Sequence, residues 1–318
     1  MPTGVKGAPG VAGSTSDEGR PKEFAFAISF KPRRACIDWE QAQANLRRTI
    51  RSVRGATRGR AGVVAVAYHD EPDLRDAGGG EVQMLRVPFP EPVDQWEGVQ
   101  DKARKRRFIG AWLRQALVGE QAYVMFLDAD DLVHKDVLEY VVEHGHGSYL
   151  VDRGYVLDLA SGLLWQRRSG FHKTCGSSFV CRFARAELPS SWEDVDSPFG
   201  QFGTPPDQRG HEDYDRVAAE LGRPPVVLPF PAVVYTVNHT ESLWRAKTEG
   251  RRSSGSPRDF VWPGDARRIL EEEFGAPDLA RRSAGLGRVS SAFARASGAR
   301  LWGRVRARGS HLLNRRSG

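Results

Sequence analysis

Three aspartates stand directly after a hydrophobic stretch in the middle of the chain. Asp128, Asp130 and Asp131 follow the segment AYVMFL (residues 122–127), which is typical of a buried strand. In open α/β sheets, ligands bind at the carboxyl ends of strands. Short carboxylates suit Mg²⁺ or Mn²⁺, and such an ion can neutralise a diphosphate and stabilise it as a leaving group. The alternative is a polar turn after a buried strand, in which Asp131 would cap the next turn.

A second acidic group lies further along the chain, in the segment HEDYD (residues 211–215). It stands at the start of a helical pattern that runs from Asp213 to Leu221. One carboxylate in such a place can serve as a general base that takes a proton from an attacking hydroxyl. The alternative is helix capping, for which Asp and Glu are common residues.

Cations and a histidine could complete a site for an anionic ligand. Lys102, Arg106 and Arg107 lie in a basic helical pattern, where they could donate charge-assisted hydrogen bonds to phosphates or form a solvated face. His239 follows a long apolar segment, and a neutral imidazole is a plausible partner for carboxylates around Mn²⁺. The polar segment HKTCGSS (residues 172–178) could lie beside a bound sugar or form a plain turn.

The elements that must position these residues alternate between strand and helix patterns. Hydrophobic periodicity predicts strands and helices in the order strand, helix, strand, strand, helix, strand over residues 24–30, 39–53, 62–68, 82–87, 101–118 and 122–127. Helices are also expected at 137–143, 213–221 and 266–274, and strands at 149–158, 179–183 and 226–237. This alternation predicts an α/β fold with a mostly parallel sheet flanked by helices.

The order of these segments resembles the GT-A glycosyltransferases, in particular family 2. The resemblance covers roughly residues 24–245, and the segments that carry it are FAISF, LRRTIRSV, VVAVAYHD, DKARKRRFIGAWL and YVMFLDADD. The last segment is the most specific of them. The resemblance implies the GT-A fold and sugar transfer from a nucleotide-sugar donor, with a UDP-sugar favoured. It also implies inversion at the anomeric carbon and a glycan or lipid-linked acceptor.

The resemblance also assigns roles to particular residues. Asp130 would bind the metal, Mn²⁺ or Mg²⁺, with Asp128 near the ribose or the metal and His239 as a further ligand. Asp213 would be the general base. Asp70, which follows the strand pattern at 62–68, would contact the nucleobase. The cations of the basic helix would bind the nucleotide phosphates, and these are Lys102, Arg106 and Arg107.

Three other interpretations stay open on the sequence alone. A nucleotidyltransferase that shares the GT-A sheet is one of them, although its phosphate-binding loop would be Gly-rich right after the first strand, where this chain has KPRR (residues 31–34). A haloacid-dehalogenase-like phosphatase would use Asp128 and Asp130 in a DxDx(T/V) motif, although Leu132 occupies the position of the Thr or Val. That motif also usually opens its domain. A catalytically degenerate GT-A domain that only binds sugar would keep the fold without the reaction.

Charge and composition divide the chain into three parts. Residues 1–22 are rich in Gly, Pro, Ser and charge, which predicts a disordered leader before a domain at 23–250. Residues 251–318 form a basic, partly helical extension. From Arg281 to Gly318 there are ten arginines and no acidic residue, so the rest of the chain is net acidic although the whole carries +7. This distribution argues against a nucleic-acid-binding protein.

The basic extension and the three cysteines bear on location. The arginine-rich stretch at 281–318 could lie on an anionic membrane surface, or it could solubilise the protein or contact another subunit. The cysteines are odd in number and have no zinc-like spacing, which favours a reducing compartment. We therefore expect a cytoplasmic protein, with a possible peripheral contact at the inner membrane face and no nucleic-acid partner.

Overall fold

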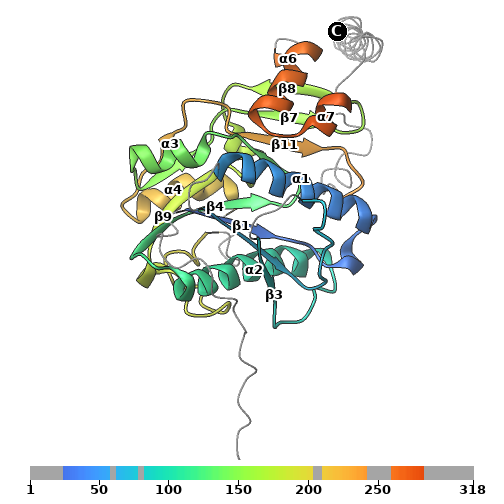
Figure 1. Ribbon diagram of the computed structural model, residues 1–318. Helices are drawn as coiled ribbons and strands as arrows, with labels where there is room; N and C mark the ends of the chain where they lie inside the picture. The colour runs from blue at the N-terminus through green and yellow to red at the C-terminus, as the bar shows by residue number, and fades with distance from the viewer. Residues whose placement is uncertain (1–23, 58–61, 78–81, 203–209, 242–258, 283–318) are drawn as a thin grey trace, which may run out of the picture.

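The computed structural model describes residues 24–57, 62–77, 82–202, 210–241 and 259–282, which form an α/β fold with two sheets (Figure 1). The larger sheet has seven strands in the order β10-β6-β9-β4-β1-β2-β3. Four of them form its parallel half: β1 (Phe24–Ser29), β2 (Gly62–Tyr68), β3 (Val82–Arg86) and β4 (Gln121–Asp128). The predicted fold class, a largely parallel sheet flanked by helices, is confirmed.

The register of the parallel strands brings their carboxyl ends to one edge of the sheet. Ser29 at the end of β1 pairs with Asp128 of β4 on one side and with Ala67 of β2 on the other. Tyr68 of β2 pairs in turn with Arg86 of β3. The segments that follow these strands therefore meet at this edge.

Side chains of β1 alternate between two cores, as expected of a strand that is buried on both faces. Phe24, Phe26 and Ile28 point to one core, whereas Ala25 and Ala27 point to the other. The first core packs against α1 (Trp39–Thr57) and α3 (Val137–His144), and the second packs against α2 (Gln95–Ala116) and α4 (Tyr214–Glu220). Figure 1 shows α1 and α2 on opposite sides of β1 and β4.

The other half of the large sheet contains an antiparallel strand. β9 (Phe179–Ala184) runs antiparallel to β4 and to β6 (Ser148–Leu150), and β10 (Val226–Val227) continues the sheet beside β6. The loop that precedes β9 therefore comes to the edge where β4 ends. This places the segment at residues 172–178 next to the acidic run.

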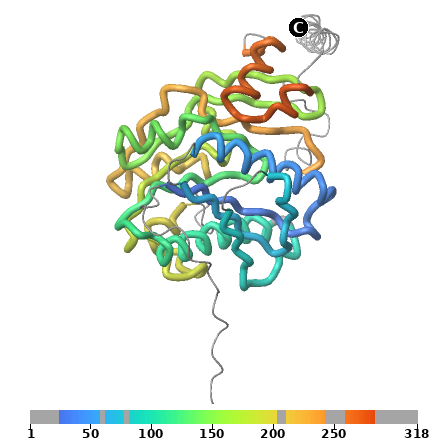
Figure 2. Tube along the Cα trace, in the orientation of Figure 1, coloured from blue at the N-terminus to red at the C-terminus, as the bar shows by residue number. Residues whose placement is uncertain are grey.

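A second sheet of four strands covers the face of α1 that points away from the large sheet (Figures 1 and 2). Its order is β5-β11-β7-β8, and the strands are β5 (Leu132–Val133), β11 (Val233–Val237), β7 (Gly154–Asp158) and β8 (Leu163–Arg167). Three short helical segments pack on it with a shared apolar core, namely α6 (Pro263–Arg268), the π-helical turn η6 (Ile269–Glu273) and α7 (Pro277–Arg282). Part of the predicted extension at 251–318 thus belongs to the folded body.

Two segments that were predicted as single strands are each divided between the two sheets. The segment 149–158 forms β6 and β7, and the segment 226–237 forms β10 and β11. Pro229 and Pro231 separate the second pair, because proline cannot donate to a strand ladder. The helix predicted from residue 101 begins at Gln95, where the Asp94 side chain accepts a hydrogen bond from the Glu97 amide.

The terminal predictions fall largely outside the described residues. This holds for the leader at 1–22 and for most of the arginine-rich stretch, residues 283–318. Within the part of the chain that the structure describes, no helix is long and apolar enough to cross a membrane. All three cysteines are free thiols.

Candidate functional site

Asp128 ends the central strand β4 and faces the basic helix α2. Its Oδ1 lies 2.5 Å from the Lys102 ammonium and 3.5 Å from the Arg106 guanidinium. The Arg106 guanidinium also stacks on the ring of Phe126, two residues before Asp128 on β4. Burial opposes ionisation of Asp128, yet these two cations hold the pKa of its carboxyl below the ordinary value. Asp128 is therefore ionised within a positively charged setting that suits a diphosphate.

Asp131 is fully buried. Its carboxyl connects separate segments of the chain and does not cap the following turn. Its carboxyl accepts hydrogen bonds from Ser177 Oγ at 2.5 Å, from Cys175 Sγ at 3.3 Å and from the Thr236 amide at 3.3 Å. Burial and the neighbouring carboxylates, Asp130 and Asp128, raise its pKa well above the ordinary value. Asp131 thus joins the acidic run to the loop before β9 and to β11.

The loop before β9 approaches the acidic run closely at Gly176. A Cβ atom placed on Gly176 would lie 3.0 Å from Asp128 Oδ2. In the same loop, Ser177 Oγ accepts a hydrogen bond from the Asp128 amide while it donates to Asp131. The segment predicted as sugar contact or plain turn therefore positions the aspartates themselves.

The Asp130 side chain contacts His239, which follows β11. His239 Nε2 lies 2.9 Å from Asp130 Oδ2, and Thr236 Oγ1 donates to the Asp130 carbonyl at 2.7 Å. The Asp130 side chain is 28% exposed, whereas that of His239 is only 3% exposed. The structure thus brings together Asp130 and His239, although 109 residues separate them in the sequence.

Asp213 lies in η4 (His211–Asp213), the 3-10 turn that leads into α4 and packs beside η2 (Phe171–Lys173). Its carboxylate is partly exposed and lies 3.2 Å from the Arg216 guanidinium. The next residue, Tyr214, is buried, and its hydroxyl accepts a hydrogen bond from Arg106. Because Arg106 also faces Asp128, one arginine links the predicted base segment to the acidic run.

His211 was not among the predicted site residues, but the structure places it beside them. Its Nε2 is buried and has no hydrogen-bond partner among the described residues. Burial lowers its pKa, and the charges that act on it include those of Asp128, Lys102 and Arg106. The signal in the sequence was its place directly before Glu212 and Asp213.

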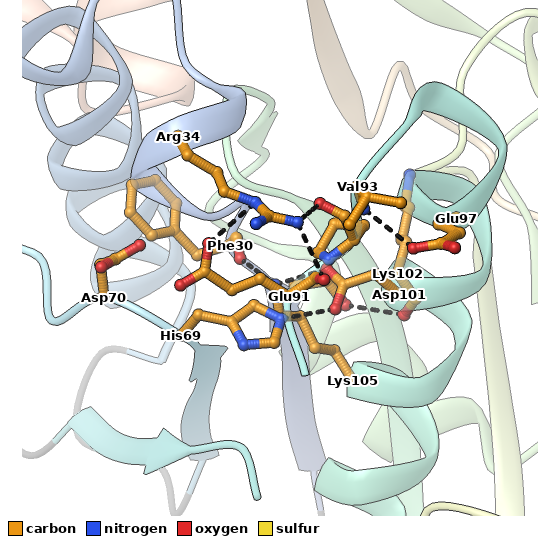
Figure 3. Close-up of polar contacts among 12 residues, drawn as sticks. Phe30, Arg34, His69, Asp70, Glu91, Val93, Glu97, Asp101, Lys102 and Lys105 are labelled. Atoms are coloured by element: carbon orange, nitrogen blue, oxygen red, sulfur yellow. Dashed lines mark hydrogen bonds and ion pairs between the residues drawn. The ribbon is translucent and has the colours of Figure 1, made fainter. Parts of the chain in front are cut away.

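Asp70, which was predicted to contact a nucleobase, lies beside the carboxyl ends of β1 and β2 (Figure 3). Asp70 Oδ2 accepts a hydrogen bond from the Arg33 amide at 2.7 Å. Nearby, Arg34 pairs with Glu91 at 3.1 Å. Asp70 therefore lies at the same edge of the sheet as Asp128, and it orders the loop that follows β1.

A buried polar cluster below this loop anchors α2, and the sequence analysis did not identify it. Asp101 lies 2.6 Å from both His69 Nε2 and Lys105 Nζ, and Lys105 also donates to the Phe30 carbonyl at 2.7 Å (Figure 3). Desolvation lowers the pKa of Lys105, and the charge of Asp101 opposes this shift. The cluster holds the helix of Lys102 and Arg106 against the ends of β1 and β2.

Arg107, the third predicted phosphate ligand of α2, has a hydrogen-bond partner on another segment of the chain. Its Nε donates to the Trp192 carbonyl at 2.7 Å, and burial lowers its pKa. On α2 it is the immediate neighbour of Arg106, so its side chain leaves the helix in another direction. Lys102 and Arg106 are the cations of this helix that reach Asp128.

The donor set suits a hard divalent cation, although no complete set of ligands is assembled. Among the described residues, no three His, Cys, Asp or Glu side chains converge as a ready-made metal site. Asp128 and Asp130 offer partly exposed carboxylate oxygens, the ligand type that Mg²⁺ and Mn²⁺ prefer. Bound substrate commonly completes the coordination of such ions, so two carboxylates fit a metal that arrives with a nucleotide diphosphate.

Comparison with known proteins gave structural likenesses only. No family model and no curated protein matches the chain. A structure described as a nucleotide-diphospho-sugar transferase from Desulfovibrio desulfuricans is 9% identical, with a TM-score of 0.37, and the match covers 82% of this chain and 95% of that one.

Two fungal structures give similar values. Core-mannan synthase A from Aspergillus fumigatus, in its Mn/GDP form, is 11% identical with a TM-score of 0.35, over 83% of this chain and 88% of that one. The mannosyltransferase Ktr4p from S. cerevisiae, in complex with GDP, is 11% identical with a TM-score of 0.32, over 84% of each chain. All three TM-scores are below 0.4.

Proposed function

We propose that this protein is a metal-dependent glycosyltransferase of the GT-A type, which transfers a sugar from a nucleotide-sugar donor. The observation that carries the proposal is the pairing of Asp128, at the end of the central strand, with Lys102 and Arg106 of α2. Cations and carboxylates side by side at the carboxyl edge of a parallel sheet suit a metal-bound diphosphate.

In this proposal, each part of the site has a separate task. Lys102 and Arg106 bind the phosphates, Asp128 and Asp130 bind the metal, and Asp70 contacts the nucleobase. A bound Mn²⁺ or Mg²⁺ would neutralise the charge that develops on the leaving diphosphate. Asp213 removes a proton from the acceptor hydroxyl, and its partly exposed carboxylate is accessible to an acceptor.

The finer features are proposals that follow from the family 2 resemblance. They comprise inversion at the anomeric carbon, a UDP-sugar as the favoured donor, and a glycan or lipid-linked acceptor. A lipid-linked acceptor would agree with membrane contact through residues 281–318. Full-length protein should co-sediment with anionic vesicles, while protein that ends at residue 282 should stay in the supernatant. Equal sedimentation would contradict a role for the tail.

The phosphatase alternative gains no support from the fold. Asp128 ends β4, the fourth strand along the described chain, whereas the phosphatase motif usually opens its domain. Gly176 and Ser177 also crowd the acidic run from the loop before β9. A degenerate domain that binds sugar without transfer would keep the same geometry. An activity measurement therefore distinguishes this domain from an active glycosyltransferase.

The proposal is tested by the products that the protein releases from candidate substrates. Wild type is incubated with Mn²⁺ and UDP-, GDP- or dTDP-sugars, and slow transfer to water is followed as release of nucleoside diphosphate. We expect release from one donor, lost with EDTA and in Asp130→Ala. Release of inorganic phosphate from p-nitrophenyl phosphate, without nucleoside diphosphate from any donor, would instead identify a phosphatase.

A further inference from the structure

A series of hydrogen bonds connects the C-terminal helix α7 to Asp130. Arg48 Nε lies 2.6 Å from Asp278 Oδ2, and Arg48 Nη1 donates to Asn45 Oδ1 at 2.9 Å. Asn45 Nδ2 lies 3.3 Å from His239 Nδ1, and His239 Nε2 lies 2.9 Å from Asp130 Oδ2. Asn45, Arg48 and His239, the residues in the middle of this series, are buried.

Arg48 determines which atom donates and which accepts in each hydrogen bond of this series. A guanidinium can only donate, so the atom of Asn45 that faces it must be the amide oxygen. Gln41 Nε2 also lies at that oxygen, at 2.7 Å. The Asn45 NH₂ group therefore faces His239 Nδ1 and donates to it. It follows that Nδ1 has no proton, so the proton of the neutral imidazole is on Nε2, which donates to Asp130.

The backbone around His239 supports a fixed ring position. Asn238 has φ of 56°, and it is the only described non-glycine residue with a positive φ. Its side chain donates to Asp158 Oδ2 at 2.8 Å, which holds this unusual conformation in place. The turn directs the next residue, His239, into the space between Asn45 and Asp130.

We propose that His239 is a positioning residue for Asp130 and not a metal ligand, an inference that rests on the metal site of the proposed function. A ligating nitrogen must offer a lone pair, but the Nε2 that faces Asp130 carries a proton. Metal-ligating histidines usually donate their other N–H to a carboxylate or carbonyl, whereas His239 Nδ1 faces an NH₂ group. His239 thus orients the Asp130 carboxylate, and α1 and α7 support it.

The inference is tested by electron spin echo spectroscopy of Mn²⁺ bound to the full-length protein, with UDP and, in a parallel sample, GDP. Protein labelled with ¹⁵N-histidine is compared with unlabelled protein, because a ligating imidazole nitrogen modulates the Mn²⁺ echo. We expect no histidine coupling in wild type. In Asn45→Asp the new carboxylate accepts a proton from Nδ1, which frees the Nε2 lone pair, so histidine coupling should appear.

Matched variants give a second readout of the same inference. His239→Leu removes the donor and should weaken Mn²⁺ binding by about 10- to 100-fold, as loss of an outer-shell partner commonly does. His239→Gln keeps an N–H near the place of Nε2 and should bind Mn²⁺ within a few-fold of wild type. Circular dichroism of each variant establishes that the fold is retained.

Each outcome separates the inference from the proposed function. Histidine coupling in wild type that disappears in His239→Gln would make His239 a ligand, and this would overturn the inference while the metal site stands. Absence of coupling in Asn45→Asp would contradict the tautomer argument that carries the inference, because coordination by His239 would then not depend on Asn45. If wild type binds no Mn²⁺ with either nucleotide, the metal site of the proposed function itself fails.

Discussion

The four consecutive residues from Asp128 to Asp131 show how neighbours in sequence acquire different environments. Asp128 faces two cations, Asp130 faces an imidazole, and Asp131 is buried among hydroxyl, thiol and amide donors. These surroundings lower the pKa of Asp128 and raise that of Asp131. The surroundings of each aspartate in the fold therefore determine its chemical role. Of the three aspartates, only Asp128 and Asp130 are accessible to a ligand.

Asp213→Asn should nearly abolish sugar transfer and leave donor binding unchanged. The amide cannot accept the proton of the acceptor hydroxyl, and loss of a general base typically lowers the rate by about 10²- to 10⁴-fold. Transfer rates and donor affinities of purified protein would be measured side by side. Asp215→Asn, two residues further along the same helix start, is the matched control. A wild-type rate in Asp213→Asn would show that another group is the base.

Gly176→Ala should weaken metal-dependent donor binding without unfolding the protein. The added methyl group would lie 3.0 Å from Asp128 Oδ2, which is closer than an ordinary contact, so the carboxylate must shift. Gly55→Ala is a suitable control, because a Cβ atom there meets nothing within 4 Å. Calorimetry with Mn²⁺ and the preferred donor would measure the effect. Unchanged affinity in Gly176→Ala would mean that the position of Asp128 does not govern binding.

At the scale of elements, the site depends on contacts between segments that are distant in sequence. Arg106 on α2 reaches Tyr214 at the start of α4 across 108 residues, and Asn45 on α1 reaches His239 across 194. The buried cluster of Asp101 and Lys105 holds α2 in place for the first of these contacts. Helix positions therefore determine which cations face the acidic run.

Tyr214→Phe should lower both the stability and the donor affinity of the protein. The substitution keeps the buried ring but leaves Arg106 without its hydroxyl partner, which typically costs about 1–3 kcal/mol of unfolding free energy. Tyr149→Phe is the control, since that hydroxyl is also buried and bonds to Val141 and His146 away from the site. Denaturant unfolding should show a lower free energy of unfolding in both variants. Affinity for the sugar donor should fall only in Tyr214→Phe. Equal donor affinities in the two variants would show that the contact between Tyr214 and Arg106 does not support donor binding.

Local patterns in the sequence predicted the elements well and the tertiary contacts less well. Asp128 and Lys102 were identified because a strand end and a basic helix are visible in short windows. The burial of Asp131 and the turn of Arg107 toward Trp192 depend on loops and strands that no short window contains. The division of 226–237 between two sheets was missed although Pro229 and Pro231 mark it.

At the scale of the whole molecule, Asp131 connects three parts of the fold through one buried carboxyl. It joins the end of β4 to the loop before β9 and to β11, so it lies where the two sheets meet. A carboxyl with a raised pKa in the folded state makes stability depend on pH.

The stability advantage of Asp131→Asn over wild type should grow as the pH rises above 3.8, the ordinary pKa of the group. The unfolded chain releases its proton first, so rising pH favours unfolding of wild type until folded Asp131 also ionises. The slope can reach roughly 1.4 kcal/mol per pH unit for one group. Denaturant unfolding in EDTA at several pH values would measure it. A difference that is flat with pH would contradict the raised pKa.

The metal-dependent donor site is tested most directly by calorimetric binding of UDP-, GDP- and dTDP-sugars to wild type and Asp130→Ala, each with Mn²⁺ and with EDTA. We predict that one donor binds wild type only when Mn²⁺ is present, and that Asp130→Ala loses this binding. Such a result would establish the donor site and name its nucleotide. If no donor binds under any condition, or if the same donor binds equally with EDTA, the proposed metal-dependent donor site is wrong.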